Sequence, residues 1–325
     1  MHRPVLFLLA ALCSLPAPRA GAAPFGFTAA LDTVWSAGDT RYLMELLGDP
    51  GVSSELIFPL DTWLEGARLR CKPPVRGRRF WSVELAFHTN LLDPLGLMQD
   101  YDWWMYPNIP KVPFSYTESA AAMRWYQASA EAQIAWVSGG WGSLALAFGY
   151  RFQFIEQRIT GYTGWYLDDN FDGIVDSYHS DQDLTTPVLD YRVLYHTATA
   201  GLALTLTPAL GLTLSAEAGL ALPYVSDRDD HLLRCKLSTA SGFGYGGYAG
   251  LEARYTWTHS NPRLRPFLAL SGSVLGLKAR TLQTQTWYGN DPGYSGDETG
   301  TSLYGIDHQI STRQYRAAFV SGLEF

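Results

Sequence analysis

The stretch Ser143-Leu144-Ala145-Leu146-Ala147-Phe148-Gly149-Tyr150-Arg151-Phe152-Gln153-Phe154 decides the fold, because its side chains alternate between two chemical types. Every second residue is large and apolar, and the residues between them are small or polar. A period of two predicts a β-strand with two different faces. The length of this run matches the roughly nine to eleven residues of a tilted strand that crosses a bilayer. Strands of globular proteins are shorter, at about five or six residues.

The same alternation recurs on both sides of this stretch, over about ten strand-length segments in all. Lipid offers no hydrogen bonds to an open sheet edge, so a sheet in a membrane must close. The polar residues of these runs then face a wet lumen. We therefore predict an all-β fold, a closed antiparallel transmembrane β-barrel of about ten strands with long extracellular loops. Further clear examples of the alternation are residues 81–88, 126–136, 212–220 and 249–257.

Short and long connections alternate along the chain, as expected for periplasmic turns and outer loops. The short ones contain turn residues, at 139–142, 207–211 and 259–262. The long polar stretches lie near 97–118, 160–188, 226–245 and 283–307. A narrow barrel of this size is filled by its own side chains, which argues against a pore.

The first residues have the pattern of a secretory signal. A short basic start precedes an apolar run from Val5 to Leu12 and the small residues Ala20-Gly21-Ala22. We expect a signal peptide over 1–22 and one outer-membrane barrel domain over 23–325. The run is too short for a membrane-spanning helix, which needs about 20 residues.

The charge of the chain limits its partners. With 24 Lys+Arg against 31 Asp+Glu the formal net charge is −7, which argues against nucleic acid as a partner. An acidic surface attracts basic peptides instead. After the signal only Cys71 and Cys235 remain; a disulfide between them and two unpaired thiols are both open, because the sequence does not show their distance.

Two acidic segments follow strands that run toward the outer end of the predicted barrel. One contains Asp100 and Asp102, and the other contains Asp227, Asp229 and His231. In extended backbone, residues two apart point the same way. Each segment can therefore present a pair of side chains to one cavity at the barrel mouth.

Such a set suits hydrolysis by an activated water. Histidine is the side chain most readily tuned as a base near neutral pH, and an adjacent carboxylate fixes the ring and stabilises the imidazolium. Two neighbouring carboxylates on the opposite side share a proton, since like charges do not ionise independently. No serine or cysteine nucleophile is required. A similar acid–histidine pair, Asp307-His308, is given no role.

These two segments resemble those of a known family. Met98-Gln99-Asp100-Tyr101-Asp102-Trp103 resembles the Asp-x-Asp-Trp segment of the omptins, and Asp227-Arg228-Asp229-Asp230-His231 resembles their Asp-x-Asp-x-His segment. The resemblance extends over 23–325 in length, in loop order and in a last strand that ends on Phe325. Omptins are outer-membrane endopeptidases of the aspartic type that cut next to basic residues.

The resemblance implies a role for each matched residue. Asp229 and His231 would activate the water, Asp100 and Asp102 would oppose them, and Asp227 would read the basic side chain of a polypeptide substrate. The active site would face the extracellular side. The chemistry requires no cofactor, and we expect a monomer whose other partner is outer-membrane lipid.

The chain also departs from the omptin pattern. A second specificity acid, late in the first strand, has no match; Thr40 or Arg41 falls near its position, with Glu45 as a candidate substitute. The family binds lipopolysaccharide through basic and aromatic residues on its outer wall. Here Leu194 stands where an arginine is expected, between Arg192 and His196, and the segment after Tyr150 also differs. These departures argue against a dependence on lipopolysaccharide.

One motif lies outside the resemblance. Asp168, Asn170 and Asp172, with an acid at Asp176, match the first half of a calcium loop, in which alternating oxygens bind a hard cation. The bidentate acid that closes such loops is replaced by His179. The alternatives are a structural Ca²⁺ that orders the third outer loop and an ordinary polar turn.

Two other functions remain open for such a barrel. A non-enzymatic adhesin or receptor for basic ligands would use the same acidic mouth. A lipid hydrolase would need a serine beside a histidine on the lipid-facing wall, and the strand of residues 143–154 has no such pair.

Overall fold

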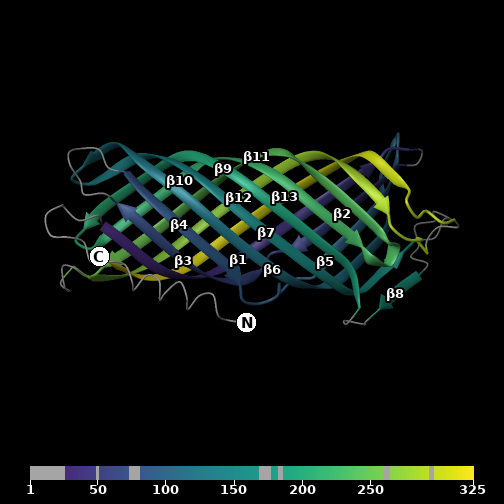
Figure 1. Ribbon diagram of the computed structural model, residues 1–325, viewed down its shortest axis with the longest axis horizontal. Coiled ribbons are helices and arrows are strands. Elements are labelled where there is room, and N and C mark those ends of the chain that lie inside the picture. The colour runs from purple at the N-terminus through teal and green to yellow at the C-terminus, as the bar shows by residue number, and fades with distance from the viewer. Residues whose placement is uncertain are drawn as a thin grey trace.

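The chain forms one antiparallel sheet that closes on itself as a cylinder (Figure 1). The structure is a computed structural model that describes residues 26–48, 51–72, 81–167, 177–181, 186–258, 264–292 and 296–325. Within these residues the sheet has 13 strands, and no helix is long and apolar enough to cross a membrane. The elements are β1 (Gly26–Leu46), β2 (Gly51–Pro59), β3 (Thr62–Lys72), β4 (Trp81–Asn90), β5 (Met98–Tyr106), β6 (Ile109–Gly139), β7 (Gly142–Tyr166), β8 (Ser177–Asp181), β9 (Pro187–Ala209), β10 (Leu212–His231), the 3₁₀ turn η1 (Leu232–Arg234), β11 (Lys236–Thr256), β12 (Arg265–Trp287) and β13 (Ser302–Glu324).

The 13 strands occupy about ten positions around the cylinder. β2 and β3 lie end to end along β1, and β4 and β5 lie end to end along β6. β8 is a short strand on the outer part of β7. The ring closes where β1 pairs with β13, next to Gly26 and Phe325. We call the end of the cylinder that contains Gly26 and Phe325 the terminal end. The opposite end, formed by the tips of β2, β5, β8 and η1, is called the mouth.

The alternation in the decisive stretch gives the two faces of β7. Ala145, Ala147 and Gln153 are buried in the lumen, whereas Phe148 and Tyr150 are exposed on the outer wall. An apolar face turned outward is the reverse of a globular protein and is typical of a surface in contact with lipid. The prediction of a closed all-β barrel is therefore confirmed.

The lumen is filled by hydrogen-bonded polar side chains, as the size of the ring predicts. Gln153 donates to Gln127 at 3.1 Å and to Gln314 at 3.0 Å, which links β7 to β13 through the interior. Closer to the terminal end, Asp32 accepts from Arg68 at 2.5 Å and lies 2.9 Å from Nε2 of His88. Hydrogen bonds of this kind between buried side chains link strands across the interior of the cylinder.

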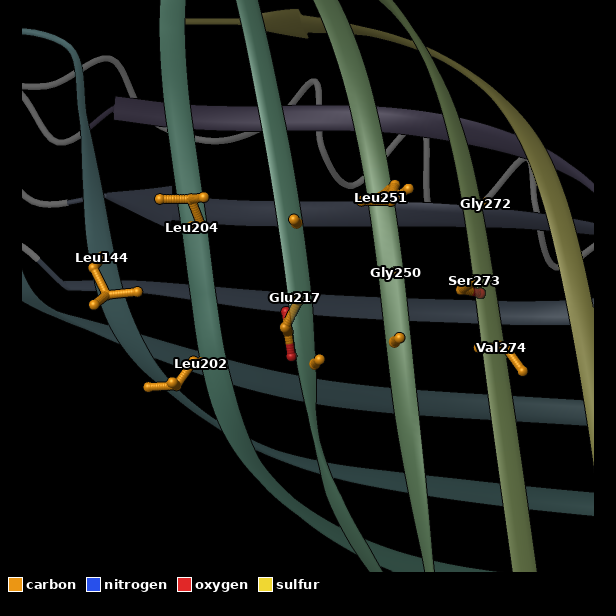
Figure 2. A pocket seen from close by; sticks show the side chains of 12 residues that line it. Leu144, Leu202, Leu204, Glu217, Gly250, Leu251, Gly272, Ser273 and Val274 are labelled. Atoms are coloured by element: carbon orange, nitrogen blue, oxygen red, sulfur yellow. The ribbon is translucent and has the colours of Figure 1, made fainter.

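The outer wall also has a shallow hollow over β9 to β12 (Figure 2). It is lined by small residues such as Ala216, Ala218 and Gly272 together with Leu202 and Leu251. Glu217 belongs to the other face of β10, where its carboxylate accepts a hydrogen bond from Tyr248 at 2.6 Å.

Two of the polar stretches expected to be long loops, 97–118 and 226–245, are extensions of the strands, so that expectation was wrong for these two. β10 runs on to His231, and β11 starts at Lys236 after the single turn η1. β5 and β6 likewise form a hairpin across the stretch 97–118. We call the belt of outward-facing apolar side chains such as Phe148, Tyr150 and Leu202 the apolar band. Beyond this band a strand is solvated, so its backbone hydrogen bonds can form without apolar alternation in the sequence. The acidic segments are therefore held on rigid strands.

Cys71 and Cys235 are both free thiols. Cys71 lies at the terminal end, opposite Phe27 and Val83, whereas Cys235 lies at the mouth, directly after η1. The alternative of a disulfide is thereby settled in favour of two thiols, because the barrel holds them at opposite ends.

Candidate active site

Asp229 and His231 form a pair on the lumen face of β10, at the mouth. Their spacing of two residues gives both side chains one direction, and Nε2 of His231 lies 2.8 Å from Oδ2 of Asp229. Asp229 is completely buried, between Tyr191 on β9 and Ser238 on β11, whereas the side chain of His231 is 22% exposed. A buried carboxylate thus lies against an imidazole that is partly exposed at the mouth.

Asp100 and Asp102 lie on β5, opposite Leu56 and Ser54 of β2. Asp102 accepts a hydrogen bond from Ser115 at 2.6 Å. Oδ1 of Asp100 is inaccessible to solvent and has no hydrogen-bond donor within the described part of the chain. Burial raises the pKa of Asp100 well above its usual value, and the charge of Asp102 raises it further.

The two acidic segments, more than a hundred residues apart in sequence, interact electrostatically. The charge of Asp229 also raises the pKa of Asp100, which requires the carboxylates to lie within range of each other in the mouth. Burial raises the pKa of Tyr166 on β7, and the charges of Asp100 and Asp102 raise it further, so its hydroxyl borders the same space.

Two cations offset these acids, and the sequence reasoning missed both. Arg234 of η1 and Lys236 of β11 each lower the pKa of Asp100. Lys236 is buried, with Nζ 6.0 Å from the centroid of the Trp287 ring, and burial followed by the charge of Arg234 lowers its own pKa. Both residues lie just past the motif that ends at His231, across a turn whose compactness the sequence did not show.

Asp227 lies one step deeper than the pair on the same face of β10. Its side chain is 1% exposed, and neither of its oxygens accepts a side-chain hydrogen bond from the described residues. Burial, followed by the charge of Asp229, raises the pKa of Asp227 well above its usual value. A buried carboxylate without a side-chain partner is costly unless it gains a proton or a cation.

His308 is the neighbour of Asp227 that the sequence reasoning set aside. Its Nε2 lies 3.5 Å from Oδ2 of Asp227, and its side chain has no exposed surface. Its sequence partner Asp307 instead forms an exposed pair with Arg280. The sequence did contain one sign that His308 is buried. Alternate residues of β13 share a face, and His308 lies on the buried face with Ile306 and Ile310. The register that brings β13 close to Asp227 could not be read from the sequence.

Glu45, a candidate for the second specificity acid, does not lie beside Asp227. It stands on the opposite face of β1 from Tyr42, and its carboxylate accepts from Lys111 at 2.7 Å. Thr40 is buried on the lumen face, and Arg41 pairs with Asp39 at 3.2 Å. None of these three residues therefore places a second acid beside Asp227.

The outer wall near Leu194 carries charged residues that pair among themselves. Arg192 donates to Glu156 at 2.7 Å, and Arg158 donates to Asp190 at 3.0 Å. His196, two residues from Leu194, lies 2.6 Å from the hydroxyl of Tyr150.

The calcium motif Asp168, Asn170, Asp172 and Asp176 lies outside the described residues. Over the residues that are described, no three His, Cys, Asp or Glu side chains gather in a way that could hold a metal ion.

The comparisons with known proteins bear on the fold. No protein-family model matches the chain, and no curated protein sequence matches it. The crystal structure of outer membrane protease OmpT from Escherichia coli is similar, with a TM-score of 0.72 over 94% of this chain and 98% of that chain, at 14% identity. The transport unit of the autotransporter AIDA-I from Escherichia coli matches at a TM-score of only 0.30. At such low identity the likeness to OmpT shows the fold alone, which is that of an outer-membrane β-barrel with an omptin-like arrangement of strands.

Proposed function

We propose that the protein is an outer-membrane endopeptidase that cleaves polypeptides next to basic residues, with its mouth facing the cell exterior. The observation that carries the proposal is the 2.8 Å contact between His231 and buried Asp229, together with the electrostatic coupling of Asp229 to Asp100. The omptin-like fold adds support, because the chain presents its two motifs on strands of such a barrel.

The proposed reaction needs one water between the two acidic segments. Nε2 of His231 faces Asp229, so Nδ1 takes a proton from the water as its oxygen attacks the scissile carbonyl. The negative charge of Asp229 stabilises the imidazolium. The same proton then passes from the imidazolium to the departing amine, which breaks the peptide bond.

Asp100 and Asp102 would hold the water and the developing oxyanion. Burial favours the protonated form of Asp100, and a neutral carboxyl can donate a hydrogen bond where a carboxylate cannot. Asp102 receives its own hydrogen bond from Ser115, which fits a carboxylate that accepts from the water. The pair thus supplies one donor and one acceptor.

The test is cleavage of fluorogenic peptides that contain Arg-Arg or Lys-Arg, by the mature chain refolded in detergent. We expect His231→Ala and Asp100→Ala to abolish cleavage, and His196→Ala, on the outer wall, to leave it unchanged. Runs with and without lipopolysaccharide test the expectation that the lipid is not required. Retained cleavage in His231→Ala would overturn the proposal.

The second candidate is a non-enzymatic adhesin or receptor for basic ligands. It is favoured by Oδ1 of Asp100 and both carboxylate oxygens of Asp227, which are buried, lack side-chain donors among the described residues and would attract a basic group without any chemistry. A folded barrel that binds basic peptides and cleaves none of a broad library supports this candidate instead.

A further inference from the structure

Asp227 and His308 face one another in a buried pocket below the Asp229–His231 pair. The two side chains come from β10 and β13, and Oδ2 of Asp227 lies 3.5 Å from Nε2 of His308. Neither atom has a side-chain hydrogen-bond partner within the described residues, and the donors near the carboxylate are the main-chain N–H groups of Ala240 and of Asp227 itself. Two buried polar atoms that point at each other without a bond are costly unless something lies between them.

The environment of His308 decides which of its nitrogens carries a proton. Nδ1 lies 2.8 Å from Oγ1 of Thr281, and that hydroxyl donates to the main-chain oxygen of His308 at 3.5 Å. Since the hydroxyl has a single hydrogen, we assign the ring proton to Nδ1, which donates to Thr281. Nε2 then presents a lone pair to Asp227. The pocket therefore contains two facing acceptors.

The groups around the pair do not resolve this conflict. The ring of Tyr42 on β1 packs edge-on against His308 with centroids 4.4 Å apart, and its hydroxyl accepts from Gln283 on β12. Tyr191 and Tyr195 on β9 and Ser238 on β11 complete the wall, and Asp229 adds a second negative charge. No Lys or Arg among the described residues forms an ion pair with Asp227. One shared proton is the simplest way for the empty pocket to satisfy both acceptors.

We propose that Asp227 and His308 form a proton-exchanging pocket, in which a guanidinium or ammonium group of the substrate displaces the proton that the pair shares when the pocket is empty. The pocket rests on the proposed function, because it would receive the basic side chain next to the cleaved bond. The head group of the substrate donates to both acceptors, and the released proton passes to solvent.

The neighbouring groups support this assignment. Burial raises the pKa of Asp227 and lowers that of His308 to about 4, so the shared proton resides on the carboxyl and is donated to Nε2. An entering cation stabilises the ionised carboxylate and reverses that preference. His308 is thus a specificity residue: it makes capture of a basic side chain dependent on pH, and a neutral side chain gains nothing by entering.

Calorimetry with butylguanidine tests the pocket independently of catalysis. Binding is measured at pH 6 in two buffers of different ionisation enthalpy, which counts the protons released. We expect close to one proton per butylguanidine in the natural protein and none for butylurea, which has the same shape without the charge. In His308→Gln the amide donates to Asp227, so release should fall toward zero. His196→Gln is the matched control on the outer wall.

A second variant guards against a folding defect in His308→Gln. Thr281→Val removes the acceptor of Nδ1 and frees Nε2 to carry the ring proton, so it should also release fewer protons. If butylguanidine fails to bind, or if release is equal in the natural protein and both variants, the pocket is wrong. Cleavage of the Arg-Arg peptide is scored separately. Proton release without cleavage leaves the pocket standing and overturns the peptidase, and cleavage without proton release does the reverse.

Discussion

Oδ2 of Asp229 lies 2.8 Å from Nε2 of His231, although the two residues belong to one strand and no turn bends the backbone between them. The alternation of a β-strand accounts for this contact, since residues two apart lie on one face. The intervening Asp230 points to the other face, where it accepts from Arg228 at 3.0 Å and from Tyr288 at 2.9 Å. The strand therefore provides its own matched pair of acids, Asp229 buried on the lumen face and Asp230 partly buried on the opposite face.

Replacement of the buried acid should reduce turnover strongly. Asp229→Asn keeps the shape but removes the charge that stabilises the imidazolium, and we expect kcat to fall by about 10³–10⁴-fold with little change in KM. Asp230→Asn, on the opposite face, should change kcat by less than about twofold. Steady-state kinetics on the Arg-Arg peptide give both values. Equal losses in the two variants would contradict a specific role for Asp229.

The pH dependence should report the protonated state of Asp100. Because burial raises its pKa, the proton is present at low pH and is lost as the pH rises through that raised value. We expect activity to decline on the alkaline side through this loss. Asp100→Asn, which keeps a donor at all pH values, should flatten the alkaline limb of the pH–rate profile at a lower maximum rate. An unchanged alkaline limb would assign the ionisation to another group.

The stability of the folded barrel should likewise decrease as the pH rises. An acid with a raised pKa in the folded barrel contributes stability below its unfolded pKa, and this contribution is lost as the pH rises through the folded value. Asp227→Asn removes the need to ionise a buried acid, so the variant should melt at a higher temperature than the natural protein at pH 9 and at a similar one at pH 4. Thermal unfolding followed by circular dichroism measures the difference. A lower melting temperature at pH 9 would show that Asp227 is ionised without penalty.

The outward face of β7 should tolerate charge only beyond the apolar band. Phe148→Arg places a cation on the exposed face near the middle of the band, and we expect it to destabilise the barrel by about 2–4 kcal/mol. Thr163→Arg, on the exposed part of the strand near the mouth, should have little effect. Refolding into lipid vesicles across a urea series gives both free energies. Similar values for the two variants would be inconsistent with a lipid-facing band.

The motif Asp168-x-Asn170-x-Asp172 remains a prediction of a calcium site. If Ca²⁺ orders this loop, limited proteolysis between 167 and 186 should slow in Ca²⁺ relative to chelator, and Asp172→Asn should remove the difference. Asp190→Asn, on β9, serves as the control. Equal cleavage with Ca²⁺ and with chelator favours an ordinary polar turn.

The fold and the pairs within each motif could be read from the sequence, because both depend on the local period of a strand. Phe148 and Gln153 take opposite faces for this reason, and so do Asp230 and its two neighbours. The extent of the strands could not be read. The polar segments around Asp102 and Asp229 have loop-like composition, yet they continue the hydrogen-bonded ladders past the apolar band.

What the sequence determined, then, is a two-faced strand repeated around a ring, and a carboxylate placed two residues from a histidine. Only the tertiary structure decided that Asp100 lies within electrostatic range of Asp229 and Lys236. It also decided that His308, and not Glu45, lies next to Asp227. The physical reason is that the shear and closure of a barrel set which strands face each other across the lumen. These quantities depend on the register of every strand pair together, and no single segment of the chain records them.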